Sequence, residues 1–138
     1  MLYFDTSALV KLLIVEAGSE LVGELWDTPL RAASSILSYP EGRAALAAAR
    51  RGARLSAPGY GRARKEFESL QGELLLVGID EQLARRAGEL AEQLELRGYD
   101  AIHLASALAL GTETMLISWD EDLRHAAAQS GCAVAPSG

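Results

Sequence analysis

The chain opens on the stretch that decides its fold, Leu2-Tyr3-Phe4-Asp5-Thr6-Ser7-Ala8-Leu9. The first three of these residues form a short apolar run, which is typical of a strand buried on both faces of a parallel sheet. Thr6 or Ser7 can then cap a helix over residues 8–13, because a hydroxyl accepts a hydrogen bond from a free N–H group of the first helical turn. A strand followed directly by a helix indicates the start of an α/β unit.

The same alternation continues along the rest of the chain. Further strands are predicted at residues 32–36, 74–77, 114–118 and 132–134, and further helices at residues 19–26, 40–52, 58–70, 81–96, 100–108 and 121–129. We expect Gly18 to end the first helix, Ser19 and Asp80 to be N-caps, Pro40 to begin its helix and Gly98 to stop the helix before it. This order predicts an α/β fold with a mostly parallel sheet, in a single domain over residues 1–138.

The charge and the cysteine content limit the partners and the compartment. The formal net charge is −6, which argues against attraction of nucleic acid to the whole surface. The charge is unevenly distributed, however, because residues 43–65 contain seven basic and no acidic side chains. A single cysteine, Cys132, excludes an internal disulfide bond and is typical of a reducing cytoplasm. Asp5 and Lys11 interrupt the apolar start of the chain, so we expect neither a signal peptide nor a membrane span.

Four acidic residues are expected at one edge of the sheet. Asp5 follows the first strand and Asp120 follows the strand at residues 114–118, while Glu41 and Asp100 lie in or just before the first turn of a helix. Ligands of open α/β sheets bind beyond the carboxyl ends of the strands, where the helix N-termini also lie. Each acid alone can be explained as a helix cap or as a partner of the helix dipole. Several carboxylates brought together repel one another, and a cation relieves that repulsion.

The residue types favour a particular metal. Carboxylate oxygens suit Mg²⁺ or Mn²⁺, whereas zinc is poorly supported because the only histidines are His103 and His125 and the lone Cys132 has no nearby partner. We expect His103 to be structural. Ser7 and Ser118 can hydrogen-bond a phosphate or a bound water. Such a site makes hydrolysis of a phosphodiester by metal-activated water plausible without a protein nucleophile.

Four stretches of the sequence resemble, in order and spacing, the motifs of the PIN-domain ribonucleases. They are Phe4-Asp5-Thr6-Ser7-Ala8-Leu9, Tyr39-Pro40-Glu41-Gly42-Arg43-Ala44-Ala45-Leu46, Tyr99-Asp100-Ala101-Ile102-His103-Leu104-Ala105-Ser106-Ala107 and Leu116-Ile117-Ser118-Trp119-Asp120-Glu121-Asp122-Leu123. The resemblance is closest to the VapC toxins of bacterial toxin–antitoxin pairs. It implies a PIN-like three-layer α/β/α sandwich and a Mg²⁺- or Mn²⁺-dependent endoribonuclease.

The resemblance also assigns site residues. Asp5, Glu41, Asp100 and Asp120 match the catalytic, metal-binding acids, and Ser7 and Ser118 match supporting polar positions. The fourth motif offers Asp122 as well. We favour Asp120, because it comes sooner after the strand and because Asp122 suits the first turn of the last helix.

Partners follow from the same resemblance. It implies RNA as substrate, a homodimer, and an antitoxin that inserts a helix into an apolar groove and places a basic residue near the acids. The helices at residues 7–15 and 19–26 are candidates to line this groove, with Trp26 as the residue to test. The basic stretch supplies candidate contacts to the RNA backbone, namely Arg43, Arg50, Arg51, Arg54, Arg62 and Arg64.

Other classes fit less well. Haloacid-dehalogenase-type phosphatases need a second aspartate two residues after the first and a late lysine, whereas this chain has Ser7 there and only Lys11 and Lys65, which come early. Response-regulator receiver domains need paired early acids, a mid-chain aspartate and a late lysine, which the sequence lacks. A non-catalytic PIN module that binds RNA or protein stays open as the alternative, and the RNA target is also open.

Overall fold

A computed structural model describes residues 1–137 of the chain. The elements follow the order β1 (Leu2–Phe4), α1 (Thr6–Lys11), α2 (Ser19–Trp26), β2 (Ala32–Ser35), α3 (Ser38–Arg51), α4 (Ala57–Glu73), β3 (Leu75–Val77), α5 (Glu81–Leu94), α6 (Gly98–Ala109), β4 (Met115–Ile117), α7 (Glu121–Gln129) and β5 (Ala133–Ala135). The five strands of this part form one sheet in the order β3-β2-β1-β4-β5, and each neighbouring pair is parallel.

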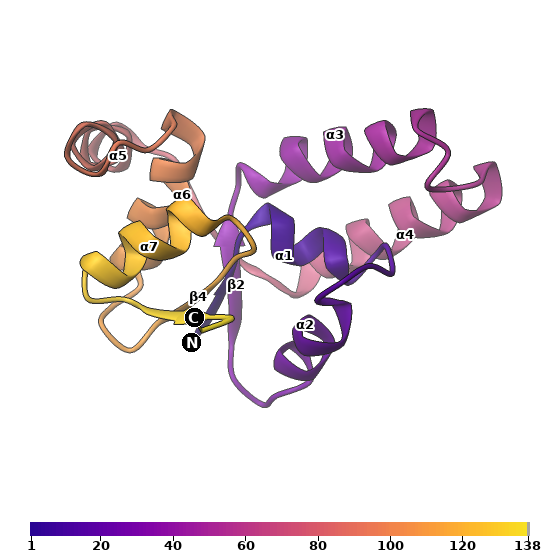
Figure 1. Cartoon of the computed structure of the whole chain (residues 1–138), viewed down its shortest axis with the longest axis horizontal. Helices are drawn as coiled ribbons and strands as arrows, with labels where there is room; N and C mark the ends of the chain where they lie inside the picture. The colour runs from indigo at the N-terminus through magenta and orange to yellow at the C-terminus, as the bar shows by residue number, and fades with distance from the viewer. Residues whose placement is uncertain (138) are drawn as a thin grey trace.

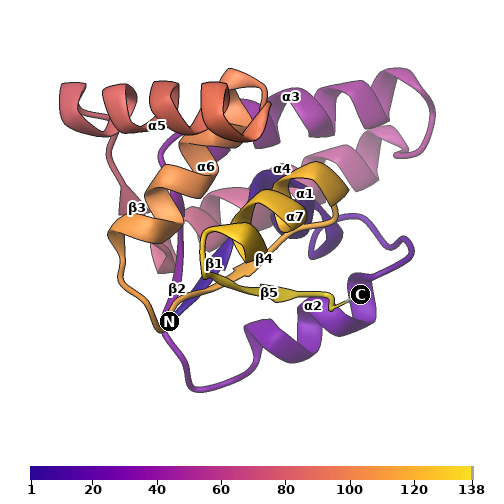
Figure 2. The same cartoon turned by 60° about the vertical axis from the view of Figure 1, so that its left-hand side comes forward.

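The sheet lies between two layers of helices, as Figure 1 shows. The helices α5, α6 and α7 cover one face, and α1 and α2 cover the other, while α3 and α4 form a hairpin that projects beyond the sheet. Figure 2 shows α6 and α7 crossing their face of the sheet, with α5 packed beside α6. The predicted three-layer α/β/α fold with a mostly parallel sheet is therefore confirmed.

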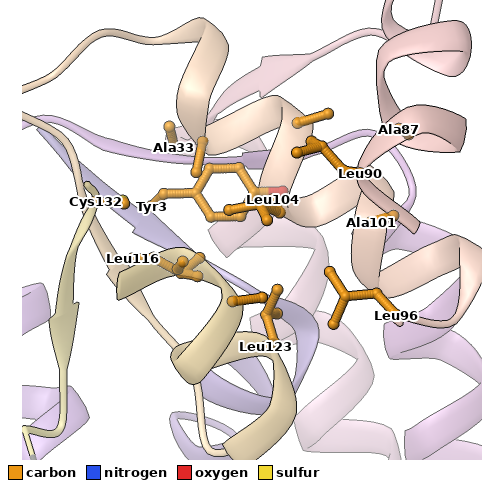
Figure 3. Packing of buried hydrophobic residues seen from close by; sticks show 14 residues of the cluster. Tyr3, Ala33, Ala87, Leu90, Leu96, Ala101, Leu104, Leu116, Leu123 and Cys132 are labelled. Carbon is orange, nitrogen blue, oxygen red and sulfur yellow. The ribbon is translucent and has the colours of Figure 1, made fainter. Parts of the chain in front are cut away.

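The first strand explains why both faces must be covered. Tyr3 points into the core formed with α5, α6 and α7, where it packs near Leu104 and Leu116 (Figure 3). Leu2 and Phe4 point the other way, into the core formed with α1 and α2. Tyr3 and Phe4 are fully buried, so the apolar opening run is satisfied only by a two-sided strand.

The hairpin of α3 and α4 has a core of its own. Leu46 and Phe67 are fully buried within it, and Val10 of α1 joins them. Gly42 lets the two helices approach closely, because a Cβ at this position would lie 2.3 Å from Cζ of Phe67. Gly42, the residue after Glu41, therefore determines how closely α3 packs against α4.

Several predicted boundaries at the start of the chain were wrong. Asp5, rather than Thr6 or Ser7, caps α1, and its side chain accepts a hydrogen bond from the backbone N–H of Ala8. The helix ends at Lys11, well before Gly18. Gly18 is itself the N-cap of α2, with a φ of +96° that glycine adopts without strain.

Two later boundaries also differ from the prediction. The helix α3 begins at Ser38 rather than Pro40, since a proline in the first turn removes no helical hydrogen bond. Gly98 does not stop α5, because Glu95 ends that helix in the left-handed conformation and Gly98 is the first residue of α6. Asp80 and Asp120 are N-caps, each accepting a hydrogen bond from a backbone N–H.

None of the helices within residues 1–137 combines the length and the hydrophobicity that crossing a bilayer requires.

Candidate active site

The strand order reverses its direction of growth at β1 and β4. The chain adds β2 and β3 on one side of β1 and then returns to place β4 on its other side. Such a reversal is the place where open α/β sheets bind ligands. Phe4 and Ile117 are register partners at the ends of these two strands, so Asp5 and Ser118, the next residues, emerge side by side.

Asp5 is the most deeply placed acid of the site, with 4% of its surface exposed. Its Oδ1 accepts hydrogen bonds from Ser7 Oγ at 2.6 Å and from Ala8 N at 2.9 Å, and its Oδ2 accepts one from Ser118 Oγ. Burial raises the pKa of Asp5 above its ordinary value, and the interactions with His103 and with these donors oppose that rise. The carboxylate is held rigidly, and its negative charge is poorly solvated.

The two serines connect Asp5 to the turn that follows β4. Ser118 Oγ accepts a hydrogen bond from Asp120 N at 3.0 Å, and Ser7 Oγ accepts one from Trp119 N at 3.1 Å. Because both hydroxyl groups donate to Asp5, their protons point at a carboxylate and not at a space for phosphate. The structure therefore shows Ser7 and Ser118 orienting an acid.

Asp100 and Asp120 both bind the guanidinium group of Arg97. Arg97 Nε donates to Asp100 Oδ2 at 2.9 Å, and Arg97 Nη2 donates to Asp120 Oδ2 at 3.1 Å. Asp120 Oδ1 meanwhile accepts a hydrogen bond from Leu123 N as the cap of α7. Burial raises the pKa of Asp100 above its ordinary value, the hydrogen bond from Arg97 offsets part of this, and the negative charge of Asp120 adds to the rise.

Glu41 lies in the first turn of α3 and is held by two side chains. Thr6 Oγ1 donates to Glu41 Oε1 at 2.6 Å, and His103 Nε2 lies 2.7 Å from the same oxygen. His103 is buried, and its Nδ1 lies 2.7 Å from the hydroxyl oxygen of Tyr3. Both contacts are satisfied when the Tyr3 hydroxyl donates to Nδ1 and the N–H at Nε2 donates to Glu41.

These contacts favour the charged form of Glu41. Burial alone would raise its pKa, but the hydrogen bonds from His103 and Thr6, together with the electrostatic influence of His103 and Arg97, outweigh burial, so the pKa of Glu41 is lowered. His103 is buried as expected for a structural residue, yet one of its nitrogens contacts a predicted metal-binding acid.

The four acids thus lie in two sets of hydrogen bonds. Ser118 and Arg97 connect Asp5, Asp120 and Asp100, whereas Glu41 belongs to a second set with Thr6 and His103. Within residues 1–137, no three His, Cys, Asp or Glu side chains are arranged as the ligands of one metal ion. The acids instead have other partners: Arg97 contacts both Asp100 and Asp120, Ser118 donates to Asp5, and Glu41 is bound by Thr6 and His103.

The chemistry of this donor set nevertheless fits a hard divalent cation. All four candidate ligands carry carboxylate oxygens, which Mg²⁺ and Mn²⁺ prefer. The raised pKa values of Asp5 and Asp100 show negative charge in poorly solvated positions, which a cation would stabilise. Arg97 already contributes one positive charge there.

Asp122 and the predicted RNA-binding arginines lie outside these sets of hydrogen bonds. Asp122 is exposed in the first turn of α7 and lines a shallow surface pocket with His125 and Ala128. The arginines are distributed over α3, α4 and the loop that joins them.

The arginines also differ in their partners. Arg43 donates to the Tyr39 hydroxyl at 2.7 Å and lies 3.7 Å from Glu68, whereas Arg54 pairs with Glu16. Arg50 contacts the carbonyl oxygen of Leu55 at 3.4 Å, and Arg64 lies 5.8 Å from the ring centre of Tyr60. Arg51 and Arg62 are exposed and form no ion pair with the described part of the chain.

Sequence reasoning did not single out Arg97, considered Thr6 only as a helix cap, and left His103 without a contact to the site. Arg97 precedes Asp100 by three residues, a spacing at which side chains at a helix start can meet. Thr6 stands within the opening motif, directly after Asp5. The contact between His103 and Glu41 joins residues 62 positions apart, so no local sequence pattern predicts it.

Comparisons with known proteins agree with this architecture. A family model described as PIN domain matches residues 2–129. The chain is similar to Ribonuclease VapC49 of Mycobacterium tuberculosis (strain ATCC 25618 / H37Rv), with 44% identity over 138 residues that cover 99% of this chain and 96% of the relative. Ribonuclease VapC46 of the same strain is 36% identical over 138 residues, which cover 99% and 98% of the two chains. The fold is also similar to that of a toxin-antitoxin complex from Klebsiella pneumoniae, with a TM-score of 0.66, 23% identity and coverage of 88% of this chain and 89% of that one.

Proposed function

The chain belongs to the PIN domain family, and we propose that it is a metal-dependent endoribonuclease and the toxin of a toxin–antitoxin pair. The observation that carries the proposal is the group of acids at the reversal of the strand order. Ser118 and Arg97 connect Asp5, Asp120 and Asp100 there, and Glu41 is bound by Thr6, the residue after Asp5. Similarity along almost the whole chain to proteins named ribonucleases supports RNA as the substrate.

We assign Mg²⁺ or Mn²⁺ to these four acids on the basis of their oxygen ligands. A divalent cation would supply activation of a water and stabilisation of the leaving oxygen in an in-line displacement at phosphorus. The protein's own part is to hold the acids in place. Ser7 and Ser118 orient Asp5, and Thr6 together with His103 orients Glu41.

Binding of the RNA backbone is assigned to the hairpin of α3 and α4. Arg51 and Arg62 support this proposal best, because they are exposed and free of ion pairs within residues 1–137. Arg43 and Arg54 would have to exchange Glu68 and Glu16 for phosphates. Exposed arginines on these two helices would attract the phosphates of RNA.

We also propose an antitoxin partner, a homodimer and a cytoplasmic location. The structural likeness to a toxin-antitoxin complex supports the partner. The outer surface of α1 and α2 is the proposed docking place. Trp26 is only partly buried there, and its ring packs edge-on against Phe4 with the centroids 5.4 Å apart. A Trp26 variant therefore has to be checked for folding before it is used to test docking.

The decisive experiment incubates the purified protein, free of any partner, with a mixed RNA pool in Mg²⁺, in Mn²⁺ and in EDTA. We expect cleavage with either metal and none in EDTA. Asp5→Asn and Asp100→Asn should abolish cleavage while the fold is retained. Asp80→Asn is the matched control, because Asp80 also caps a helix but lies at the start of α5, outside the acid set. RNA that stays intact with both metals would instead favour a non-catalytic module.

The fourth acid can be assigned by a second pair of variants. Asp120→Asn should abolish cleavage, because Asp120 lies within the set of hydrogen bonds. Asp122→Asn should retain cleavage, because Asp122 is exposed on the neighbouring turn. The opposite result would move the fourth acid to Asp122.

A further inference from the structure

Arg97 binds the two acids on which a metal ion is expected. Its Nε and Nη2 contact Asp100 Oδ2 and Asp120 Oδ2 at 2.9 Å and 3.1 Å. The Arg97 side chain is 62% exposed, against 11% for Asp100 and 28% for Asp120. The guanidinium group therefore reaches from the solvent side across two carboxylates that are themselves mostly buried.

A divalent cation and Arg97 compete for the same oxygens. Both are positive, and the guanidinium group stays protonated under all ordinary conditions, so it can yield only by moving. The backbone cannot follow, because Arg97 is the N-cap of α6 and its carbonyl oxygen accepts a hydrogen bond from Ala101 N at 3.0 Å. The movement is thus limited to the side chain, which keeps the guanidinium group at the rim of the site.

In the same conformation, Arg97 makes a second contact that does not involve the acids. The guanidinium carbon of Arg97 lies 4.9 Å from the ring centre of Tyr99, whose side chain is exposed on the same helix turn. A cation above a tyrosine ring is stabilised without needing a carboxylate. Arg97 can therefore leave Asp100 and Asp120 and still remain beside them.

We propose that Arg97 is a phosphate-binding residue of this site, bound to Asp100 and Asp120 in the metal-free protein and released to the RNA backbone when a cation occupies those acids. A guanidinium group presents parallel N–H donors that match two phosphate oxygens as well as two carboxylate oxygens. The inference rests on the proposed function, because it requires that RNA and a divalent cation meet at these acids.

The coupling between cation and RNA is what distinguishes this role from a purely structural one. If the cation frees Arg97, it makes one more phosphate-binding group available, so the cation should strengthen RNA binding. By linkage, RNA should strengthen cation binding by the same factor. A residue that only stabilised the fold would produce neither effect.

The test measures binding instead of cleavage. A labelled single-stranded RNA of mixed sequence is titrated with the full chain, with and without Ca²⁺, over a range of salt concentrations, and gels verify that the RNA stays intact. For the wild type, we expect Ca²⁺ to tighten binding by roughly fivefold or more. For Arg97→Gln, this increase in affinity should disappear, and the salt slope in Ca²⁺ should be smaller by about 0.7. Arg97→Lys should recover part of the increase, because it keeps the charge without the paired donors.

A metal titration without RNA gives an independent measurement. Calorimetric titration with Mn²⁺ should show tighter binding to Arg97→Gln than to the wild type, by roughly fivefold, because a competing cation is gone. Arg85→Gln is the matched control, since Arg85 is exposed and pairs with Glu81 on α5. It should match the wild type in both titrations, and circular dichroism verifies that all variants fold.

The possible failures are distinguishable. If Arg97→Gln binds RNA in Ca²⁺ with the affinity and salt slope of the wild type, the inference is overturned. An equal loss of affinity with and without Ca²⁺ would also overturn it, because Arg97 would then act as a general surface charge. If the wild type neither binds nor cleaves RNA, the proposed function itself fails.

Discussion

Replacing Gly42 with alanine tests how α3, the helix that carries Glu41, is held against α4. The added Cβ would lie 2.3 Å from Cζ and 2.7 Å from Cε1 of Phe67, distances that real Cβ atoms essentially never show. Phe67 is fully buried and stacks on Tyr39 with ring centroids 5.7 Å apart. The ring cannot turn into solvent, so either it or the whole of α3 has to shift.

The expected magnitude follows from two opposing contributions. Forcing a methyl group into a filled core costs about 1–3 kcal/mol. Alanine regains about 0.5–1 kcal/mol over glycine within a helix. We therefore expect Gly42→Ala to lower the free energy of unfolding by about 1–2 kcal/mol, which for a domain of this size lowers Tm by roughly 3–8 °C.

Urea denaturation followed by circular dichroism measures this change against a matched control. Gly88→Ala lies inside α5, where the added Cβ meets nothing within 4 Å, so it should stabilise the protein by about 0.5–1 kcal/mol. Phe67→Leu introduced into Gly42→Ala should restore part of the stability, because it removes the ring atoms that clash. If Gly42→Ala is as stable as the wild type, or shifts in the same direction as Gly88→Ala, the reasoning about this close approach is refuted.

Three further predictions concern the acids, the buried histidine and the basic hairpin. Burial raises the pKa of Asp5, so the folded state binds a proton more readily than the unfolded chain does. The free energy of unfolding of the wild type in EDTA should therefore fall as the pH rises from 3.8, the ordinary pKa of this carboxyl group, through its raised pKa in the folded state. Asp5→Asn should abolish this part of the decline and be more stable than the wild type near neutral pH; an unchanged pH profile in urea denaturation would contradict the assignment. Tyr3→Phe removes the hydrogen-bond partner of His103 Nδ1, so it should cost about 1–3 kcal/mol in urea denaturation and reduce cleavage, whereas full cleavage with full stability would show that this hydrogen bond has no role. Arg51→Gln and Arg62→Gln should each weaken RNA binding and reduce its salt slope by about 0.7 for every phosphate that the arginine neutralises; an unchanged slope would identify these arginines as an ordinary solvated surface.

The sequence was sufficient to predict a mostly parallel sheet, because the relevant constraints are local, whereas it did not predict the strand order. An apolar run as short as Leu2-Tyr3-Phe4 must be buried on both faces, and the residue that follows it must emerge at the carboxyl edge. The same rule put Asp120 at that edge. Order along the chain and strand polarity are enough to predict which acids lie at the same edge of the sheet, without any knowledge of packing.

Packing decided what the sequence could not. Gly98 fits the end of one helix as well as the beginning of the next. In the structure it begins α6, because Glu95 adopts the left-handed conformation that ends α5. The partners of the acids are long-range: Tyr3 and His103 are 100 positions apart, and Asp5 and Ser118 are 113 positions apart. The sequence also could not predict that Arg97 contacts two acids, because its second partner, Asp120, lies at the start of a different helix.

The structural and the functional explanations of the acids turn out to be compatible, because they use different oxygens of the same carboxylate. Oδ1 of Asp120 caps α7 while Oδ2 faces Arg97. Oδ1 of Asp5 caps α1 and binds Ser7, while Oδ2 accepts the hydrogen bond from Ser118. A cap holds the first oxygen in place and so fixes the direction of the second. An alanine at either position would remove the cap and the charge together, whereas asparagine keeps the cap and removes only the charge. Loss of cleavage in the asparagine variants, with helix content and stability retained, is therefore the result that separates an acid that binds metal from one that only starts a helix.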